Sequence, residues 1–213
     1  ISEAEGFSSV ALLETTLFSR PSPQLDKRFG PLDASEYESM YSRLVGFYEN
    51  YTLKTFENIN YGGNYFVLRE GGRIIAGVQA NPVAWKFVSM PGVGGSVMMH
   101  VFPRVPVLRK LFNPECHRFL ALEGIFLESG QEEELFPLLE SALAHFHVSS
   151  AMLQLDAKDS LLHLLKSSEK LGFMNRFSKR IRTHVMAKFI IAKGVQRLHL
   201  RGQPVYVSSF DFT

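Results

Sequence analysis

Four consecutive polar residues, Gln131 to Glu134, come shortly after an apolar stretch at residues 119–127. A strand, a tight turn and an amphipathic helix together form one common type of phosphate-binding site. Such a site needs glycines and unhindered backbone N–H groups at its turn. Here the turn has Gly130 before Gln131, and three glutamates follow. These residue types favour a helix that supplies its own anions over one that accepts a phosphate.

The helix expected at 131–146 has one apolar face. Its members recur at helical spacing, and they are Leu135, Leu138, Leu139, Ala142, Leu143 and Phe146. Each first-turn glutamate stabilises the helix dipole by about 0.3–1 kcal/mol. Ser129 and Glu132 also have the spacing of a capping box. A diphosphate would be repelled there, since two unit charges about 4 Å apart repel by ~1 kcal/mol in water and ~4 kcal/mol near a protein surface.

Histidine and cysteine residues do not form a metal-binding pattern. His145 and His147 are two residues apart but lie at the end of the expected helix, and Cys116 has no second cysteine near it. A zinc site needs a complete set of about four ligands, so we expect no metal. One cysteine in the whole chain excludes an internal disulfide framework and fits the reducing cytoplasm.

The elements that must position these residues can be predicted from local patterns. A helix is expected from Asp33, which is a good N-cap with Glu36 three residues later. Its aromatic stripe is expected to face the core; it comprises Tyr37, Met40, Tyr41, Leu44, Phe47, Tyr48 and Tyr51. Strands at 64–70 and 73–80 flank two glycines, which predicts a tight hairpin.

The remaining segments are predicted to alternate between strands and helices. Strands are expected at 7–18, 119–127, 151–156 and 182–191, a helix at 160–173 ending at Gly172, and a final hairpin at 195–210. Residues 91–118 are predicted to be a connecting loop, because their glycines fit no phosphate-binding spacing. Residues 19–31 contain three prolines and are predicted to be a linker.

From residue 33 onward the expected order is helix, hairpin, strand, helix, strand, helix, strand. This order, with the stretch Glu169-Lys-Leu-Gly-Phe173, resembles the GNAT superfamily of acyl-CoA-dependent N-acyltransferases. The resemblance covers roughly residues 33–191. It implies an α+β fold with a mixed central sheet flanked by helices. It also implies that the 119–127 strand and the following helix would bind acetyl-CoA or another acyl-CoA.

The resemblance also implies roles for individual residues. Glu123 lies where some family members place a carboxylate general base, which activates the substrate amine through water. A structural alternative is an outward-facing Glu123 or one paired with Arg118. The cofactor-binding positions would be Ile125, Leu127, Gly130 and Gln131.

This sequence departs from the family pattern in three places. The family turn reads R/Q-x-x-G-x-G/A, but Gln131, Glu133 and Leu135 stand where glycines are expected. Ser168 replaces the tyrosine that often protonates the departing thiolate, and a serine is a poor general acid at neutral pH. The asparagine expected after the 151–156 strand is also out of register.

We therefore predict two parts of the chain. Residues 1–30 are a strand and linker, with the end of a preceding domain as one interpretation of them, and residues 31–213 are a GNAT-like domain. The favoured function is a companion domain of an acyl-CoA-dependent N-acyltransferase, degenerate at its pyrophosphate turn. One alternative is a divergent single-domain acyltransferase with Glu123 as base. Another is a non-catalytic binding or scaffold module.

Charge and composition restrict the partners. The 213 residues carry a net charge of +2, which gives no argument for nucleic acid. No run of about 18 apolar residues is present, so no membrane-spanning helix is expected. The resemblance implies a small-molecule or peptide amine as acceptor, and we also expect a cytoplasmic protein that can form a homodimer.

Overall fold

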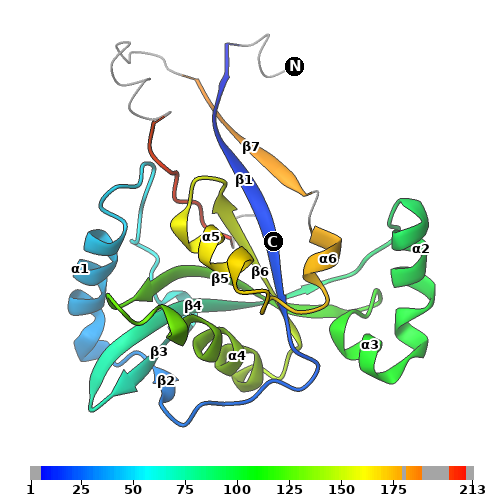
Figure 1. Cartoon of the computed structure of the whole chain (residues 1–213), viewed down its shortest axis with the longest axis horizontal. Coiled ribbons are helices and arrows are strands. Elements are labelled where there is room, and N and C mark those ends of the chain that lie inside the picture. The colour runs from blue at the N-terminus through cyan, green and yellow to red at the C-terminus, as the bar shows by residue number, and fades with distance from the viewer. Residues whose placement is uncertain (1–5, 179–180, 189–201, 210–213) are drawn as a thin grey trace.

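The computed structural model describes residues 6–178, 181–188 and 202–209, and its centre is a mixed seven-stranded sheet in the order β2-β3-β4-β5-β6-β1-β7 (Figure 1). The strands are β1 (Ser8–Ser19), β2 (Phe29–Pro31), β3 (Tyr65–Glu70), β4 (Arg73–Trp85), β5 (His117–Leu127), β6 (Ser150–Asp156) and β7 (Arg182–Ala187). The α-helices are α1 (Tyr37–Phe47), α2 (Gly92–His100), α3 (Pro106–Leu111), α4 (Leu135–His145), α5 (Ser160–Ser167) and α6 (Asn175–Ser178). The predicted α+β class, with a mixed sheet flanked by helices, is confirmed.

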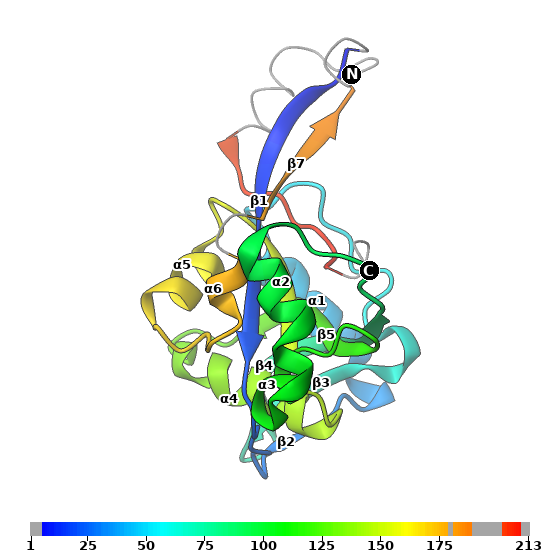
Figure 2. The ribbon, with the colours of Figure 1, turned by 90° about the vertical axis from the view of Figure 1, so that its right-hand side faces the viewer.

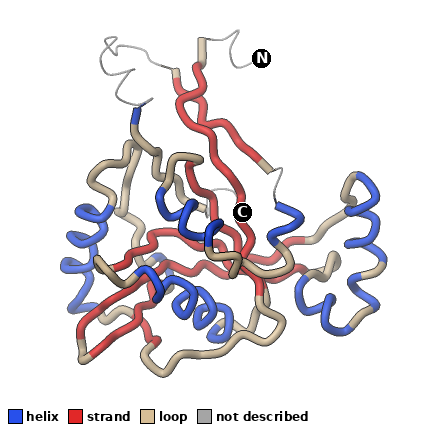
Figure 3. Tube along the Cα trace, viewed as in Figure 1, coloured by secondary structure: helices blue, strands red, loops and turns tan. Residues whose placement is uncertain are grey.

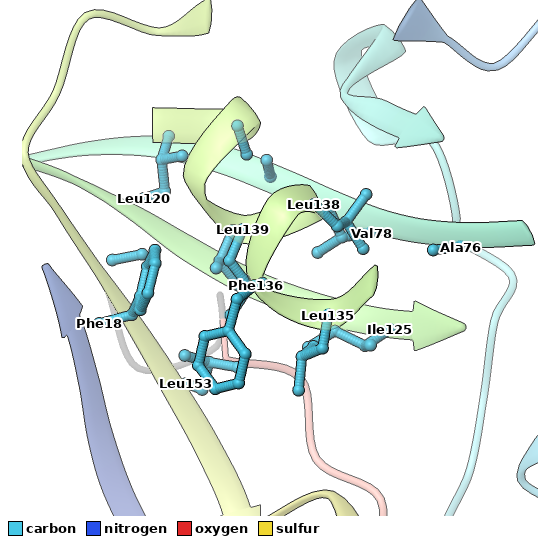
Figure 4. Packing of buried hydrophobic residues seen from close by; sticks show 14 of the residues in the cluster. Phe18, Ala76, Val78, Leu120, Ile125, Leu135, Phe136, Leu138, Leu139 and Leu153 are labelled. Carbon is cyan, nitrogen blue, oxygen red and sulfur yellow. The ribbon is translucent and has the colours of Figure 1, made fainter. Parts of the chain in front are cut away.

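Helices cover both faces of the sheet because successive strand side chains point to opposite sides. On β3, Tyr65 and Val67 pack in one hydrophobic cluster with α1, whereas Phe66 and Leu68 pack in the main core with α4. Figure 3 shows these helices around the strands. Leu138 and its neighbours on α4 cover the sheet, as Figure 4 shows. The predicted apolar face of this helix is confirmed.

The predicted hairpin between β3 and β4 is also confirmed. Gly71 and Gly72 have φ angles of +56° and +83°, as a two-residue turn that matches the strand twist requires. The predicted helix after Asp33 begins with a 3-10 turn, Ala34–Glu36, and the Glu36 carboxylate accepts a hydrogen bond from the Asp33 N–H at 3.0 Å. The aromatic stripe is only partly buried, since Tyr41 is 40% exposed.

β1 lies inside the same sheet as the rest of the chain. It is antiparallel to β6 on one side and to β7 on the other, with Leu13 opposite both Asp156 and Thr183. β1 and β7 continue as a two-stranded ribbon beyond the other strands (Figure 2). The predicted strand at 7–18 is therefore confirmed. Its assignment to a preceding domain stays a prediction.

The predicted helix at 160–173 is too long. α5 ends at Ser167, and Glu169 takes a left-handed conformation with φ +55°. Gly172, with φ +88°, lies so close to β1 that an added Cβ would be 2.3 Å from the Ser19 carbonyl oxygen. This glycine is therefore required by a close backbone approach and by its own φ angle, and it does not cap α5.

The predicted loop at 91–118 is wrong, because this stretch contains α2, α3 and the 3-10 turn Phe102–Arg104. We call residues 86–116 the arm; it projects from the sheet between β4 and β5 (Figure 1). Met98, Phe102 and Phe112 are each 2–3% exposed and pack together. Tertiary packing thus stabilises helices whose glycines have low helix propensity.

Half of the C-terminal hairpin predicted at 195–210 lies outside the described residues. In the described part, Val205 forms one isolated parallel bridge with Thr52. The strand predicted at 182–191 is confirmed for β7, and its remainder is largely outside the description. Among the described residues, no helix combines the length and apolar character needed to cross a bilayer.

Candidate functional site

β5 and β6 begin side by side and then separate. They pair in parallel only at Leu120–Ala151 and Ala121–Met152. β5 then bulges at Gly124, where φ is +55° and the register with β4 shifts. β6 instead continues its pairing with β1 as far as Asp156. Beyond these paired positions, an opening therefore lies between β5 and β6, where the two strands form no hydrogen bonds with each other.

The opening holds a C-terminal segment of the same chain, residues 204–209, which we call the insert. On the β5 side, the Gly124 N–H donates to the Tyr206 hydroxyl at 3.1 Å. On the β6 side, the Gln154 N–H donates to Ser209 Oγ at 2.9 Å. The Val205 N–H also donates to the Asp156 carboxylate at 2.9 Å. Only about 20 Å³ remains free, which is room for about one water molecule.

Two buried tyrosines satisfy the neighbouring carbonyl groups of β5. The Tyr48 hydroxyl donates to the Ile125 carbonyl oxygen at 2.8 Å, and the Tyr65 hydroxyl donates to the Gly124 carbonyl oxygen at 2.9 Å. Burial raises the pKa of both tyrosines well above the usual value, so both remain protonated donors. The backbone polar groups that a ligand would need at the bulge are thus already paired within the chain.

Asp159 closes the same region at the start of α5. Its carboxylate accepts hydrogen bonds from the Tyr51 hydroxyl and from the Leu161 N–H, each at 2.8 Å. Desolvation raises the pKa of Asp159, and these two hydrogen bonds oppose that rise. Asp159 is therefore the N-cap of α5 and a partner of Tyr51, in a position where it stabilises the fold.

Glu123 lies beside a second cavity, of about 390 Å³, on the other side of Tyr206. Its Oε1 accepts a hydrogen bond from Asn81 Nδ2 at 2.9 Å. Gln79, which is 3% exposed, lines the same cavity. The Asn81 Oδ1 atom is buried and has no hydrogen-bond partner among the described residues. A carboxylate and an amide that line a cavity of this size, with Asn81 behind the carboxylate, can hold a small polar molecule and accept a proton from it.

The predicted cofactor-binding residues are not gathered in one place. Ile125 and Glu123 both line the filled opening between β5 and β6. Leu127 packs in the same main core as Ile125 but does not line the opening, and neither Gly130 nor Gln131 is among the described residues that line it. Gly130 has φ +80° and is exposed in the turn before α4. Their assignment to an acyl-CoA site stays a prediction.

The acidic turn before α4 is held by groups of the same chain. The capping box predicted for Ser129 and Glu132 is wrong, because Gln131 is the N-cap of the 3-10 turn Glu132–Glu134. Glu132 instead accepts a weak hydrogen bond from the Gly130 N–H at 3.4 Å. The helical turn therefore begins two residues later than a capping box at Ser129 would require.

Within the described part of the chain, no group of three or more His, Cys, Asp or Glu residues is placed to hold a metal ion. Cys116, the single cysteine of the sequence, is exposed.

Comparison of the sequence with models of protein families and with curated proteins gives no match. Solved structures do match. One is an acetyltransferase assigned to the GNAT family from Novosphingobium aromaticivorans, with a TM-score of 0.49 and 13% identity over 86% of this chain and 68% of that one. In fold, this chain is similar to a GNAT acetyltransferase.

A second solved structure that matches is a GCN5-related N-acetyltransferase from Sphaerobacter thermophilus, with a TM-score of 0.41 and 10% identity. The match covers 86% of this chain and 51% of that one, so the chain spans about half of its length. At these TM-scores, the similarity assigns no residue role to this chain.

Sequence reasoning missed Gln79 and Tyr206 as parts of the site. A signal for Gln79 was present, since it is the one amide in the otherwise apolar run at 74–80. Tyr206 had no such signal, because its position depends on how the C-terminal segment crosses the sheet. Residues that are remote in sequence meet at the β5 bulge only after the fold is formed.

Proposed function

We propose that this chain is a GNAT-like domain of an acyl-CoA-dependent N-acyltransferase and acts as a companion to a catalytic domain. The observation that carries the proposal is the insert, which occupies the opening between β5 and β6. The insert accepts hydrogen bonds from Gly124 on β5 and from Gln154 on β6, so it is held by both strands at once. An extended acyl-CoA chain would have to displace these contacts before it could lie there.

The acidic turn supports the same proposal. Glu134 contributes an anion near the N-terminus of α4 and is paired with Arg28. The exposed carboxylates of Glu132 and Glu133 in the same turn would repel a diphosphate that approached the backbone N–H groups at this end. In the proposed role, the companion domain shapes the cleft for a small-molecule or peptide amine. A preceding GNAT domain, or a second copy of this chain, is its partner.

The test is a calorimetric titration of the full chain with acetyl-CoA. A micromolar complex has about 8 kcal/mol of binding free energy, and repulsion of several kcal/mol would remove much of it. We expect a dissociation constant above about 100 μM. A low-micromolar isotherm would reject the companion role and favour a domain that binds its own cofactor.

The cavity beside Glu123 favours a second candidate, a divergent acyltransferase in which Glu123 is the general base. Asn81 holds its carboxylate at 2.9 Å, facing a space of about 390 Å³. In this candidate, Glu123→Gln would abolish acetyl transfer to amines, and Glu70→Gln, at an exposed carboxylate that lines neither cavity, would not. Absence of transfer in the unaltered chain, with acetyl-CoA and a panel of amines, would reject it.

A further inference from the structure

A separate cavity of about 140 Å³ lies between the sheet and the arm. It shares no lining residue with the two cavities at Glu123. Its apolar walls come from aromatic rings and methionines: Trp85, Phe87, Phe112, Phe119, Phe177, Met90, Met98, Met152 and Met174. Methionine side chains adapt their shape and make favourable contacts with aromatic rings. Ile181, at the edge of the cavity, is 49% exposed, so the edge is open to solvent.

Ser150 places an unpaired hydroxyl group in this apolar cavity. Its side chain is 3% exposed, and its Oγ has no hydrogen-bond partner among the described residues. Thr15, which also lines the cavity, is different because its hydroxyl accepts from Gln154 Nε2 at 2.8 Å. Buried hydroxyl groups in folded proteins are nearly always paired. The exception at Ser150 therefore indicates a partner supplied from outside the chain.

His117 supplies a second polar group to the same cavity. Its ring stacks on Phe119, with centroids 5.3 Å apart and an interplanar angle of 19°. Among the described residues, the His117 ring packs against other aromatic rings, and neither ring nitrogen has a hydrogen-bond partner there. Burial lowers the pKa of His117 to about 4. At neutral pH, the uncharged ring therefore has one donor and one acceptor.

We propose that this cavity binds a small single-ring aromatic molecule that carries one hydroxyl or amino group. The volume sets the size, because an apolar cavity of about 150 Å³ accommodates benzene. The ligand should be uncharged, because the described residues that line the cavity include no Asp, Glu, Lys or Arg. The polar group of the ligand pairs with Ser150 and His117, and the ring packs among the methionines and aromatic side chains.

The experiment is a titration of the full chain with phenol and with toluene, monitored by NMR chemical shifts of the methionine methyl groups. Phenol and toluene have similar size, but only phenol can pair with Ser150. We expect both to shift the Met152 and Met174 signals. In Ser150→Ala, the phenol affinity should fall about fivefold, the factor for one neutral hydrogen bond. The toluene affinity should change by less than about twofold.

Ser149→Ala is the matched control, because Ser149 is the neighbouring serine and does not line this cavity. It should leave both affinities unchanged. If Ser150→Ala does not fold, Ser150→Thr keeps the hydroxyl and adds a methyl group to the cavity, so both affinities should fall. The proposal is overturned if neither compound binds at millimolar concentration. It is also overturned if Ser150→Ala weakens phenol and toluene equally, or weakens neither.

Discussion

Arg28 binds Glu134 through two parallel hydrogen bonds, from Nη1 to Oε1 at 2.8 Å and from Nη2 to Oε2 at 2.7 Å. The same guanidinium donates to the carboxylate of Asp26, with Nη2 and Oδ2 2.8 Å apart. These hydrogen bonds to Glu134 and Asp26 raise the pKa of Arg28 above its usual value. The pair joins the segment between β1 and β2 to the N-terminal end of α4. The acidic turn is therefore part of the packing of α4.

Glu134→Gln should lower the free energy of unfolding by about 1–2 kcal/mol, because a two-point charged pair is stronger than a neutral one. Both side chains are partly buried, at 26% and 13% exposure, so salt should weaken the effect only in part. Denaturant midpoints at low and high salt would measure it.

Glu133→Gln is the matched control for this substitution. Glu133 is exposed in the same turn and contributes only through the helix dipole, which is worth about 0.3–1 kcal/mol. Its loss should be smaller and should nearly disappear at high salt. Equal losses for the two variants would contradict a structural role for the Arg28–Glu134 pair.

Stability should decrease as the pH is lowered from about 6.5 to about 4. Burial lowers the pKa of His117 from its ordinary 6.5 to about 4 in the folded protein. In this window the unfolded chain binds a proton that the folded protein does not bind, so acid favours unfolding. At 1.36 kcal/mol per pKa unit, the largest loss is about 3 kcal/mol.

His117→Phe should remove this contribution to the pH dependence, because phenylalanine keeps the aromatic packing and does not titrate. Chemical unfolding at pH 7, 5.5 and 4.5 would compare the two proteins. The exposed His100 provides the control, and His100→Gln should leave the slope of stability against pH unchanged. An identical slope in His117→Phe and the unaltered protein would show that His117 is not buried in a neutral form.

Local patterns were sufficient for elements whose own residues determine their shape. Gly71 and Gly72 predict their hairpin because the turn needs positive φ at both positions. The helix at α4 follows from its apolar spacing alone. The arm could not be predicted in this way, because Gly94 and Gly95 weaken a helix that exists through contacts of Met98 and Phe102 with distant side chains.

The candidate site was predictable only in part. Glu123 and Ile125 lie on the strand that the family resemblance identified, and both line the opening between β5 and β6. Gln79 and Tyr206 come from other parts of the chain, and no local spacing relates them to Glu123. The predicted end of the helix at Gly172 was wrong for a physical reason. Gly172 is needed because β1 passes close to it, and the same residue type is also common after helices.

The insert gives the last prediction, which concerns hydrogen exchange at the opening between β5 and β6. The Gln154 N–H is protected by Ser209 Oγ at 2.9 Å, since β5 no longer pairs with β6 at this point. Ser209→Ala removes the acceptor, and one neutral hydrogen bond is worth about 1 kcal/mol. The exchange of the Gln154 amide should therefore become roughly fivefold faster, as measured by NMR in deuterated buffer.

Ser208→Ala is the control for this experiment, because Ser208 is adjacent and the described contacts give its side chain no hydrogen-bond partner. It should leave exchange at Gln154 unchanged.

A second variant tests the β5 side of the opening, where Tyr206→Phe removes the hydroxyl group that accepts a hydrogen bond from the Gly124 N–H. The Gly124 amide should then exchange faster. Exchange of the Gln154 amide should also become faster if the whole insert dissociates from the opening as one unit. If Ser209→Ala and Tyr206→Phe both leave these amides unchanged, the insert does not occupy the opening in solution. The opening would then be free for a ligand, and the companion role would lose its main support.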